Sequence, residues 1–77
     1  MNHIENEAFA VELAEALNDM GSLPFYRRCV EWYDEDFLRE TLEKVLSIPQ
    51  RQIRRTRGAL FNKLVSSHAK KHSHPWH

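Results

Sequence analysis

Four arginines lie close together in the second half of the chain: Arg51, Arg54, Arg55 and Arg57. The guanidinium group is planar and always charged, and it binds phosphate oxygens through two parallel hydrogen bonds. Residues three and four positions apart share one face of a helix, so the spacing places Arg51, Arg54 and Arg55 in one row. Such a row is typical of a surface that binds the phosphate backbone of a nucleic acid.

Three lysines follow these arginines and extend the positive stretch: Lys63, Lys70 and Lys71. Residues 47–77 contain seven basic and no acidic side chains, a net charge of +7, whereas residues 1–46 contain eleven acidic and four basic side chains, a net charge of −7. Opposite charge on the two halves indicates binding to nucleic acid or a membrane, or a basic tail. Alternatively, the two halves pack together and neutralise each other. The sequence leaves both interpretations open.

Four of the five histidines also lie in the basic half: His68, His72, His74 and His77. His68 and His72 are four residues apart, a spacing that can place two imidazoles on one metal ion. Further ligands are missing, because no acidic residue follows Glu43 and the single cysteine, Cys29, lies far upstream. We therefore predict no metal site and no cofactor. Since His68 continues an apolar stripe of its helix, we expect it at the edge of the core.

Two further groups of residues have types that can act in catalysis, but their positions indicate a structural role. Cys29 lies in an aromatic stripe and is predicted to be a small buried hydrophobe, because a nucleophilic cysteine needs a base and a positive field. The acidic run 34–36 has the spacing of a helix N-terminus, where carboxylates stabilise the helix dipole. The chain contains no phosphate-binding glycine pattern and no zinc-finger spacing. We predict that the protein is not an enzyme and has no catalytic residues.

Helices must position these side chains, because no segment alternates apolar and polar residues over five or more positions. Apolar residues at helical spacing predict helices over residues 4–20, 22–33 and 34–46, a short helix over 49–55 and a final helix from about residue 59. The short connections favour antiparallel neighbours. We therefore predict an all-α fold, a compact bundle of four to five short helices. Residues 1–72 form the single domain and residues 73–77 a frayed tail.

The helix ends are predicted from capping residues. Gly21 is expected to end the first helix, because glycine adopts the left-handed conformation at little cost. Ser22–Pro24 and Ser47–Pro49 combine a capping serine with a proline in the first helical turn, and each predicts a helix start. Gly58 is compatible with a kink, a helix start or a close backbone approach, and the sequence does not distinguish these.

The second predicted helix is the most aromatic and is expected to be central to the core. Phe25, Cys29 and Trp32 form one stripe of this helix, and Tyr26, Val30 and Tyr33 form another. Trp32 is predicted to lie in the core. The third helix has an inward stripe that consists of Leu38, Thr41, Leu42 and Val45. Trp76, in the tail, is a candidate for stacking on a base or on a partner surface.

Length and composition narrow the class of protein. A chain of 77 residues forms one small domain with a thin core. One cysteine excludes a disulfide framework and fits a reducing compartment. No apolar run approaches the roughly 20 residues that span a bilayer, and the N-terminus lacks the pattern of a signal peptide. We expect a soluble cytoplasmic protein without a membrane partner.

Three stretches of the chain resemble a known class of module: residues 23–26 (Leu-Pro-Phe-Tyr), 37–42 (Phe-Leu-Arg-Glu-Thr-Leu) and 58–65 (Gly-Ala-Leu-Phe-Asn-Lys-Leu-Val). They are similar to the small helical modules near the C-termini of bacterial and phage replication initiators and primosomal proteins of the DnaD type. In those modules an apolar and aromatic helix pair precedes a basic segment and a Gly-Ala-aromatic helix. The likeness covers about residues 20–66. It implies a non-catalytic role with DNA or a replication complex, in which the four clustered arginines match the basic segment.

The predicted function is that of a small helical protein that binds nucleic acid or a replication-type complex through its basic C-terminal half. The predicted binding residues are Arg51, Arg54, Arg55, Arg57, Lys63, Lys70 and Lys71. The alternative is a protein–protein interaction adaptor or regulator with no nucleic-acid role, and a homodimer is compatible with either. Guanidinium groups that pair with the carboxylates of the first three helices would indicate internal neutralisation. Guanidinium groups on one open face would indicate a binding site.

Overall fold

The computed structural model describes residues 3–71, with side chains for residues 4–68. The α-helices are α1 (His3–Ala16), α2 (Leu23–Trp32), α3 (Glu35–Ser47) and α4 (Arg57–Lys71). Two short 3₁₀ helices, η1 (Met20–Ser22) and η2 (Gln50–Gln52), lie in the connections. No strand occurs between residues 3 and 71, so the predicted all-α fold with few, short helices is confirmed. No helix in this stretch is long and apolar enough to cross a membrane.

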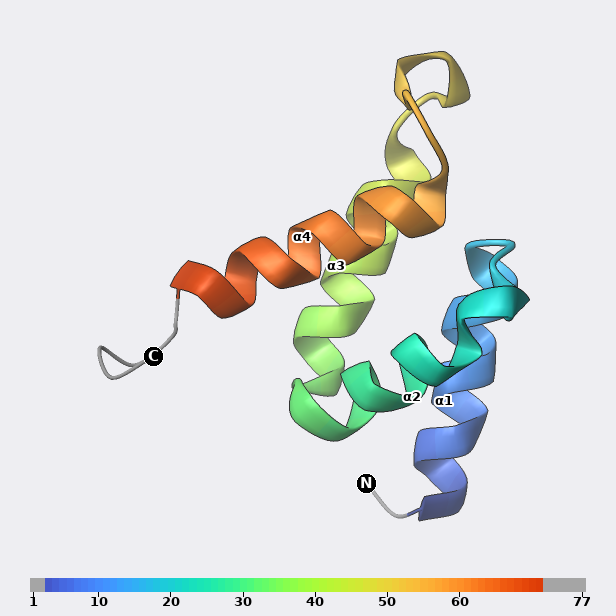
Figure 1. Cartoon of the computed structure of the whole chain (residues 1–77), viewed down its shortest axis with the longest axis vertical. Helices are drawn as coiled ribbons and strands as arrows, with labels where there is room; N and C mark the ends of the chain where they lie inside the picture. Colours follow the sequence, from blue (N-terminus) through green and yellow to red (C-terminus); the bar gives the residue numbers. More distant parts are fainter. Residues whose placement is uncertain (1–2, 72–77) are drawn as a thin grey trace.

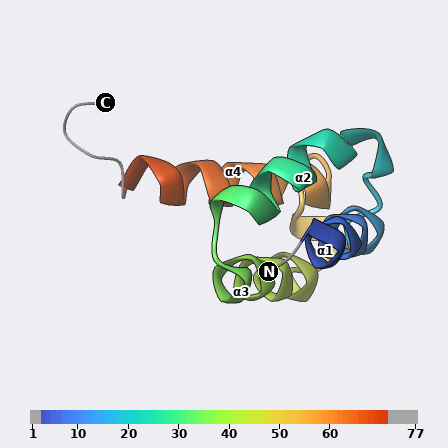
Figure 2. The ribbon, with the colours of Figure 1, turned by 90° about the horizontal axis from the view of Figure 1, so that it is seen from below.

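The helices form two layers. Figure 2 shows α1 and α3 side by side and nearly end-on, with α2 and α4 lying across them. The molecule measures 21 Å along its shortest axis, which corresponds to two helices of about 10 Å each. Each helix therefore lies in the other layer from the helix before it. The short connections had predicted antiparallel neighbours instead. In sequence order α1 packs on α2, and α3 packs on α4.

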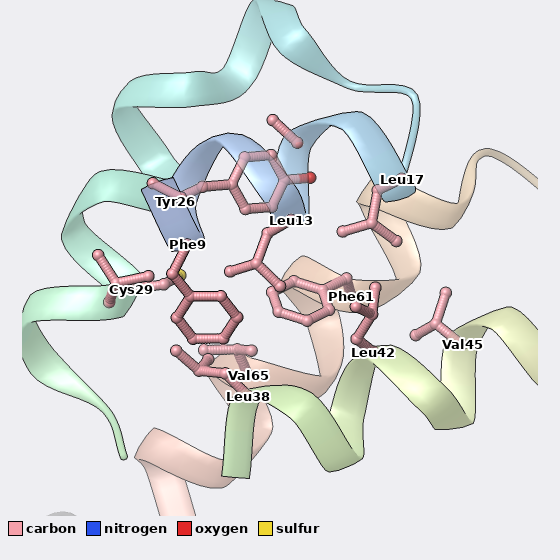
Figure 3. Close-up of a cluster of buried hydrophobic side chains, with 13 residues drawn as sticks. Phe9, Leu13, Leu17, Tyr26, Cys29, Leu38, Leu42, Val45, Phe61 and Val65 are labelled. Carbon is pink, nitrogen blue, oxygen red and sulfur yellow. The ribbon is translucent and has the colours of Figure 1, made fainter. Parts of the chain in front are cut away.

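The core lies between the two layers (Figure 3). Tyr26 of α2 and Phe61 of α4 are its largest fully buried side chains, and their ring centroids lie 5.9 Å apart. The inward stripe predicted for α3 is confirmed, since all four of its members are buried: Leu38, Thr41, Leu42 and Val45. The hydroxyl of Thr41 is satisfied locally, because it donates to the backbone oxygen of Phe37 at 2.8 Å.

The first helix ends before the predicted glycine. Asn18 adopts a positive φ of 53°, and its amide donates to Glu15 O. The Asp19 amide donates to Ala14 O, so the two bonds form a Schellman motif. Asparagine tolerates the left-handed region better than most residues, and it takes the position that we had assigned to Gly21. Gly21 lies in η1 and has no positive φ.

Trp32 is 70% exposed, so the prediction that it lies in the core is wrong. The buried face of α2 is set by Tyr26, Cys29 and Val30, which are all buried. Trp32 is the last residue of α2 and lies outside the arc that these three side chains define. Helical spacing identified two stripes on α2 but could not show which residues of α2 the other helices cover.

The predicted helix over residues 49–55 is also wrong. Only the three residues of η2 are helical there, and the amide of Ile53 closes the turn on Gln50 O. Ile53 then adopts an extended backbone, with φ −94° and ψ 115°. The chain bends at residues 54 and 55 before α4 begins at Arg57, two residues earlier than expected.

Candidate nucleic-acid interface

An open groove of about 700 Å³ lies between the bend after η2 and the first turns of α4. It is lined by Gln52, Ile53, Arg54, Arg55, Thr56, Ala59, Leu60, Asn62 and Lys63. The lining contains three cationic side chains and no carboxylate. Ile53 and Leu60 are half-buried, so they provide apolar surface between the charged groups. We call this surface the basic groove.

The bend, and not helical periodicity, brings Arg54 and Arg55 to the same groove. The expected row along a helix does not form, because the chain leaves the helical conformation at Ile53. Ile53 at the start of the bend is half-buried, and both arginines remain exposed. Arg51 is exposed on η2 nearby but does not line the groove.

Arg57 has a different position from the other three arginines. It is half-buried, and its Nη1 donates a hydrogen bond of 2.5 Å to the backbone oxygen of Val45. That oxygen belongs to the last turn of α3 and also accepts the C-cap amide of Ile48 at 3.3 Å. Arg57 therefore connects the start of α4 to the end of α3, and it does not line the groove.

The start of α4 forms one wall of the groove. The Thr56 hydroxyl accepts a hydrogen bond of 3.0 Å from the amide of Ala59, which caps the helix. Asp19 lies against the first turn of α4, because a Cβ added to Gly58 would be only 2.5 Å from its Oδ2. The Tyr26 hydroxyl holds this carboxylate by donating to Oδ2 at 2.8 Å. Of the three interpretations left open for Gly58, the helix start applies, and the group that lies close to its backbone is the side chain of Asp19 and not another backbone.

Three carboxylates of the acidic half pair with arginines of the same half. Arg27 contacts Glu7 at 2.9 Å, and Arg39 contacts Glu12 at 2.9 Å and Glu35 at 2.7 Å. Among the side chains of residues 4–68, no carboxylate pairs with an arginine of the 51–57 segment. The two halves therefore do not neutralise each other through ion pairs to these arginines.

Lys63 is exposed and lines the basic groove from α4. The backbone of α4 continues through Lys70 and Lys71, but the side chains of these two lysines lie outside the described part of the chain. The structure thus brings together three of the seven predicted binding residues, Arg54, Arg55 and Lys63. Arg51 lies close to the groove, and Arg57 contacts the end of α3 instead.

The other candidate residues have structural positions. Cys29 is buried, and burial raises the pKa of its thiol to about 11, so the thiol stays protonated at neutral pH. His68 is half-buried and stacks on Phe37 with ring centroids 3.9 Å apart, which confirms its expected place at the core edge. The described side chains include no group of three or more His, Cys, Asp or Glu that could hold a metal ion. The remaining predicted candidates lie outside the described residues: His72, His74, Trp76 and His77.

Sequence analysis missed the uncharged residues of the groove. Gln52 and Asn62 add amide groups to its lining, and Ile53 and Leu60 add apolar surface. The amides are ten residues apart and carry no joint pattern, so only the bend reveals that they face one groove. The basic residues could be found because charge is visible without any knowledge of the fold.

No family model, no curated protein and no solved structure matches the chain. The resemblance to DnaD-type modules therefore remains a prediction. The charge, shape and hydrogen bonding of the described residues are the basis on which a function can be inferred.

Proposed function

We propose that this protein is a non-catalytic nucleic-acid-binding protein that holds a phosphate backbone in its basic groove. Arg54, Arg55 and Lys63 would contact phosphate oxygens, and Arg51 would contact the backbone beside the groove. One observation carries the proposal: the groove collects three cations, includes no carboxylate in its lining, and its arginines form no ion pair within the described side chains.

The chemistry of the groove suits a phosphodiester chain. Exposed guanidinium groups without an internal carboxylate keep their full capacity for bidentate hydrogen bonds to phosphate. Each phosphate that they neutralise releases counterions, and the slope of log K against log salt steepens by about 0.9 per contact. The amides of Gln52 and Asn62 can donate to and accept from base edges, whereas Ile53 and Leu60 can contact sugars.

The proposal is tested by fluorescence anisotropy with labelled single-stranded DNA, duplex DNA and duplex RNA, at about 50 and 200 mM salt. The resemblance to replication modules makes DNA the first ligand to measure. We expect binding at the lower salt that weakens at the higher salt. The variant R54Q/R55Q should reduce affinity by about tenfold per lost phosphate contact at about 50 mM salt and flatten the salt slope.

The matched control is R28Q/K44Q, which removes the same two charges elsewhere. Arg28 of α2 and Lys44 of α3 are exposed, lie outside the groove and form no ion pair in the described part of the chain. This variant should retain nearly the parent affinity. Equal losses in both double variants would show that only net charge matters, and no binding at low salt would favour the adaptor alternative. Either result would reject the proposal.

A further inference from the structure

The two ends of the molecule carry opposite charge. In Figure 1 the bend that carries the basic groove lies at the top of the longest axis, which measures 38 Å. The N-terminal end of α1 and the connection from α2 to α3 lie at the bottom. A hollow there is lined by Glu5, Asn6, Val30, Glu31, Tyr33, Asp34 and Glu35. The lining contains no basic side chain, although Arg39 pairs with Glu35 from outside it. We call this surface the acidic end.

A large apolar side chain next to the acidic end in the sequence is also exposed, although it does not line the hollow itself. Trp32 is 70% exposed, directly between Glu31 and Tyr33 in the sequence and two residues before Asp34. Glu31 and Asp34 are both exposed, and neither forms an ion pair with a described side chain. An exposed tryptophan that is close in sequence to carboxylates without ion pairs is chemically complementary to a groove in which apolar residues lie between guanidinium groups.

The two surfaces cannot meet within one molecule. They lie at opposite ends of the 38 Å axis, whereas charges on a protein surface are screened over about 10 Å at 0.1 M salt. Their complementarity can therefore be satisfied only between molecules. The zero formal net charge of the chain means that no overall repulsion opposes the approach of two copies.

We infer that the basic groove binds the acidic end of a second copy of this chain. The indole of Trp32 packs against Ile53 and Leu60 of the next molecule, while Glu31 and Asp34 pair with Arg54 and Arg55. A tryptophan beside arginines adds a cation–π attraction, and tryptophan and arginine are the residues that most often dominate interfaces.

The contact joins two different surfaces, so each molecule keeps a free groove and a free acidic end. Such a heterologous contact builds a ring or an open chain of molecules and not a closed two-fold dimer. A contact built on one indole and two ion pairs is expected to be weak and to form at high protein concentration. This inference does not depend on the proposed function, although nucleic acid in the groove would compete with the second copy.

The experiment is sedimentation-velocity analysis of the full chain, freed of nucleic acid by nuclease, between about 10 µM and 1 mM protein. We expect the average mass to rise with concentration beyond that of a dimer at about 0.1 M salt, and to return to the monomer at about 1 M salt. The variants R54E/R55E, E31K/D34K and W32A should each remain monomeric. R28E/K44E changes charge outside both surfaces and should associate like the parent, and far-UV circular dichroism checks that each variant is folded.

A mixture of R54E/R55E with E31K/D34K is the decisive sample. The first variant keeps an intact acidic end and the second keeps an intact basic groove, so an equimolar mixture should associate although neither variant does alone. A chain that stays monomeric at every concentration would overturn the inference. So would a mass that stops at the dimer, or association that the substitutions leave unchanged.

Discussion

Asp19 is a residue whose role depends entirely on its tertiary contacts. Its carboxylate accepts a hydrogen bond from Tyr26 and lies where the Cβ of any other residue at position 58 would be. Tyr26 is fully buried, and its burial, together with the hydrogen bond to Asp19, raises its pKa above the ordinary value. The tyrosine therefore remains a neutral donor, and the start of α4 is fixed beside the turn between α1 and α2.

The variant Gly58→Ala tests this contact. Alanine favours a helix more than glycine, but its Cβ would lie 2.5 Å from Oδ2 and 3.1 Å from Cβ of Asp19. Because Tyr26 holds the carboxylate, we expect the free energy of unfolding to fall by about 1–2 kcal/mol in urea denaturation. The control is Gly21→Ala, where an added Cβ has no atom within 4 Å and stability should stay equal or rise slightly. Equal behaviour of the two variants would contradict the proposed contact.

At the scale of elements, the first turn of α4 has two functions on its different sides. Thr56, Ala59 and Leu60 line the basic groove, whereas the Arg57 side chain leaves the groove and donates to the last turn of α3. The hydrogen bond from Arg57 to Val45 O connects the start of α4, which forms one wall of the groove, to the end of α3. Four clustered arginines thus separate into one that packs helices together and three that are exposed.

Arg57→Ala is expected to reduce stability and not nucleic-acid affinity. Loss of its hydrogen bond to Val45 O should lower the free energy of unfolding by about 1 kcal/mol in urea denaturation. Arg55→Ala should leave stability nearly unchanged, since Arg55 is exposed, but should weaken binding to labelled DNA. The DNA affinities of both variants are compared under conditions in which each variant is fully folded. An Arg57→Ala protein that binds as weakly as Arg55→Ala, with unchanged stability, would show that Arg57 belongs to the binding surface.

At the scale of the whole molecule, no ion pair among the described side chains joins the acidic half to the basic half. The three ion pairs described here join groups that are all between 43% and 51% exposed, and all lie within the acidic half. Exposed pairs of this kind contribute about 0–1 kcal/mol each. The fold is therefore held by its apolar core, and the separated charges are available for other molecules.

The stability of the monomer should accordingly depend little on salt. Between about 0.1 and 1 M sodium chloride, we expect the free energy of unfolding to change by no more than about 1 kcal/mol, because the ion pairs are exposed and few. Urea denaturation at low protein concentration measures this change without adding ions. R54Q/R55Q should respond to salt as the parent does. A loss of several kcal/mol at high salt would indicate that attraction between the two halves stabilises the fold.

The sequence by itself determined the helical class, the buried stripe of α3 and the separation of charge, because each depends on the order of neighbouring residues and on local periodicity. It did not determine which side chains are paired or covered. Trp32 is exposed, Arg57 turns to Val45 and Asn18 ends α1, since contacts between helices choose among stripes and caps that are locally equivalent. All three bases of the groove, Arg54, Arg55 and Lys63, were found from charge. The bend that brings them together was not, because the spacing of the local residues favoured a helix over residues 49–55.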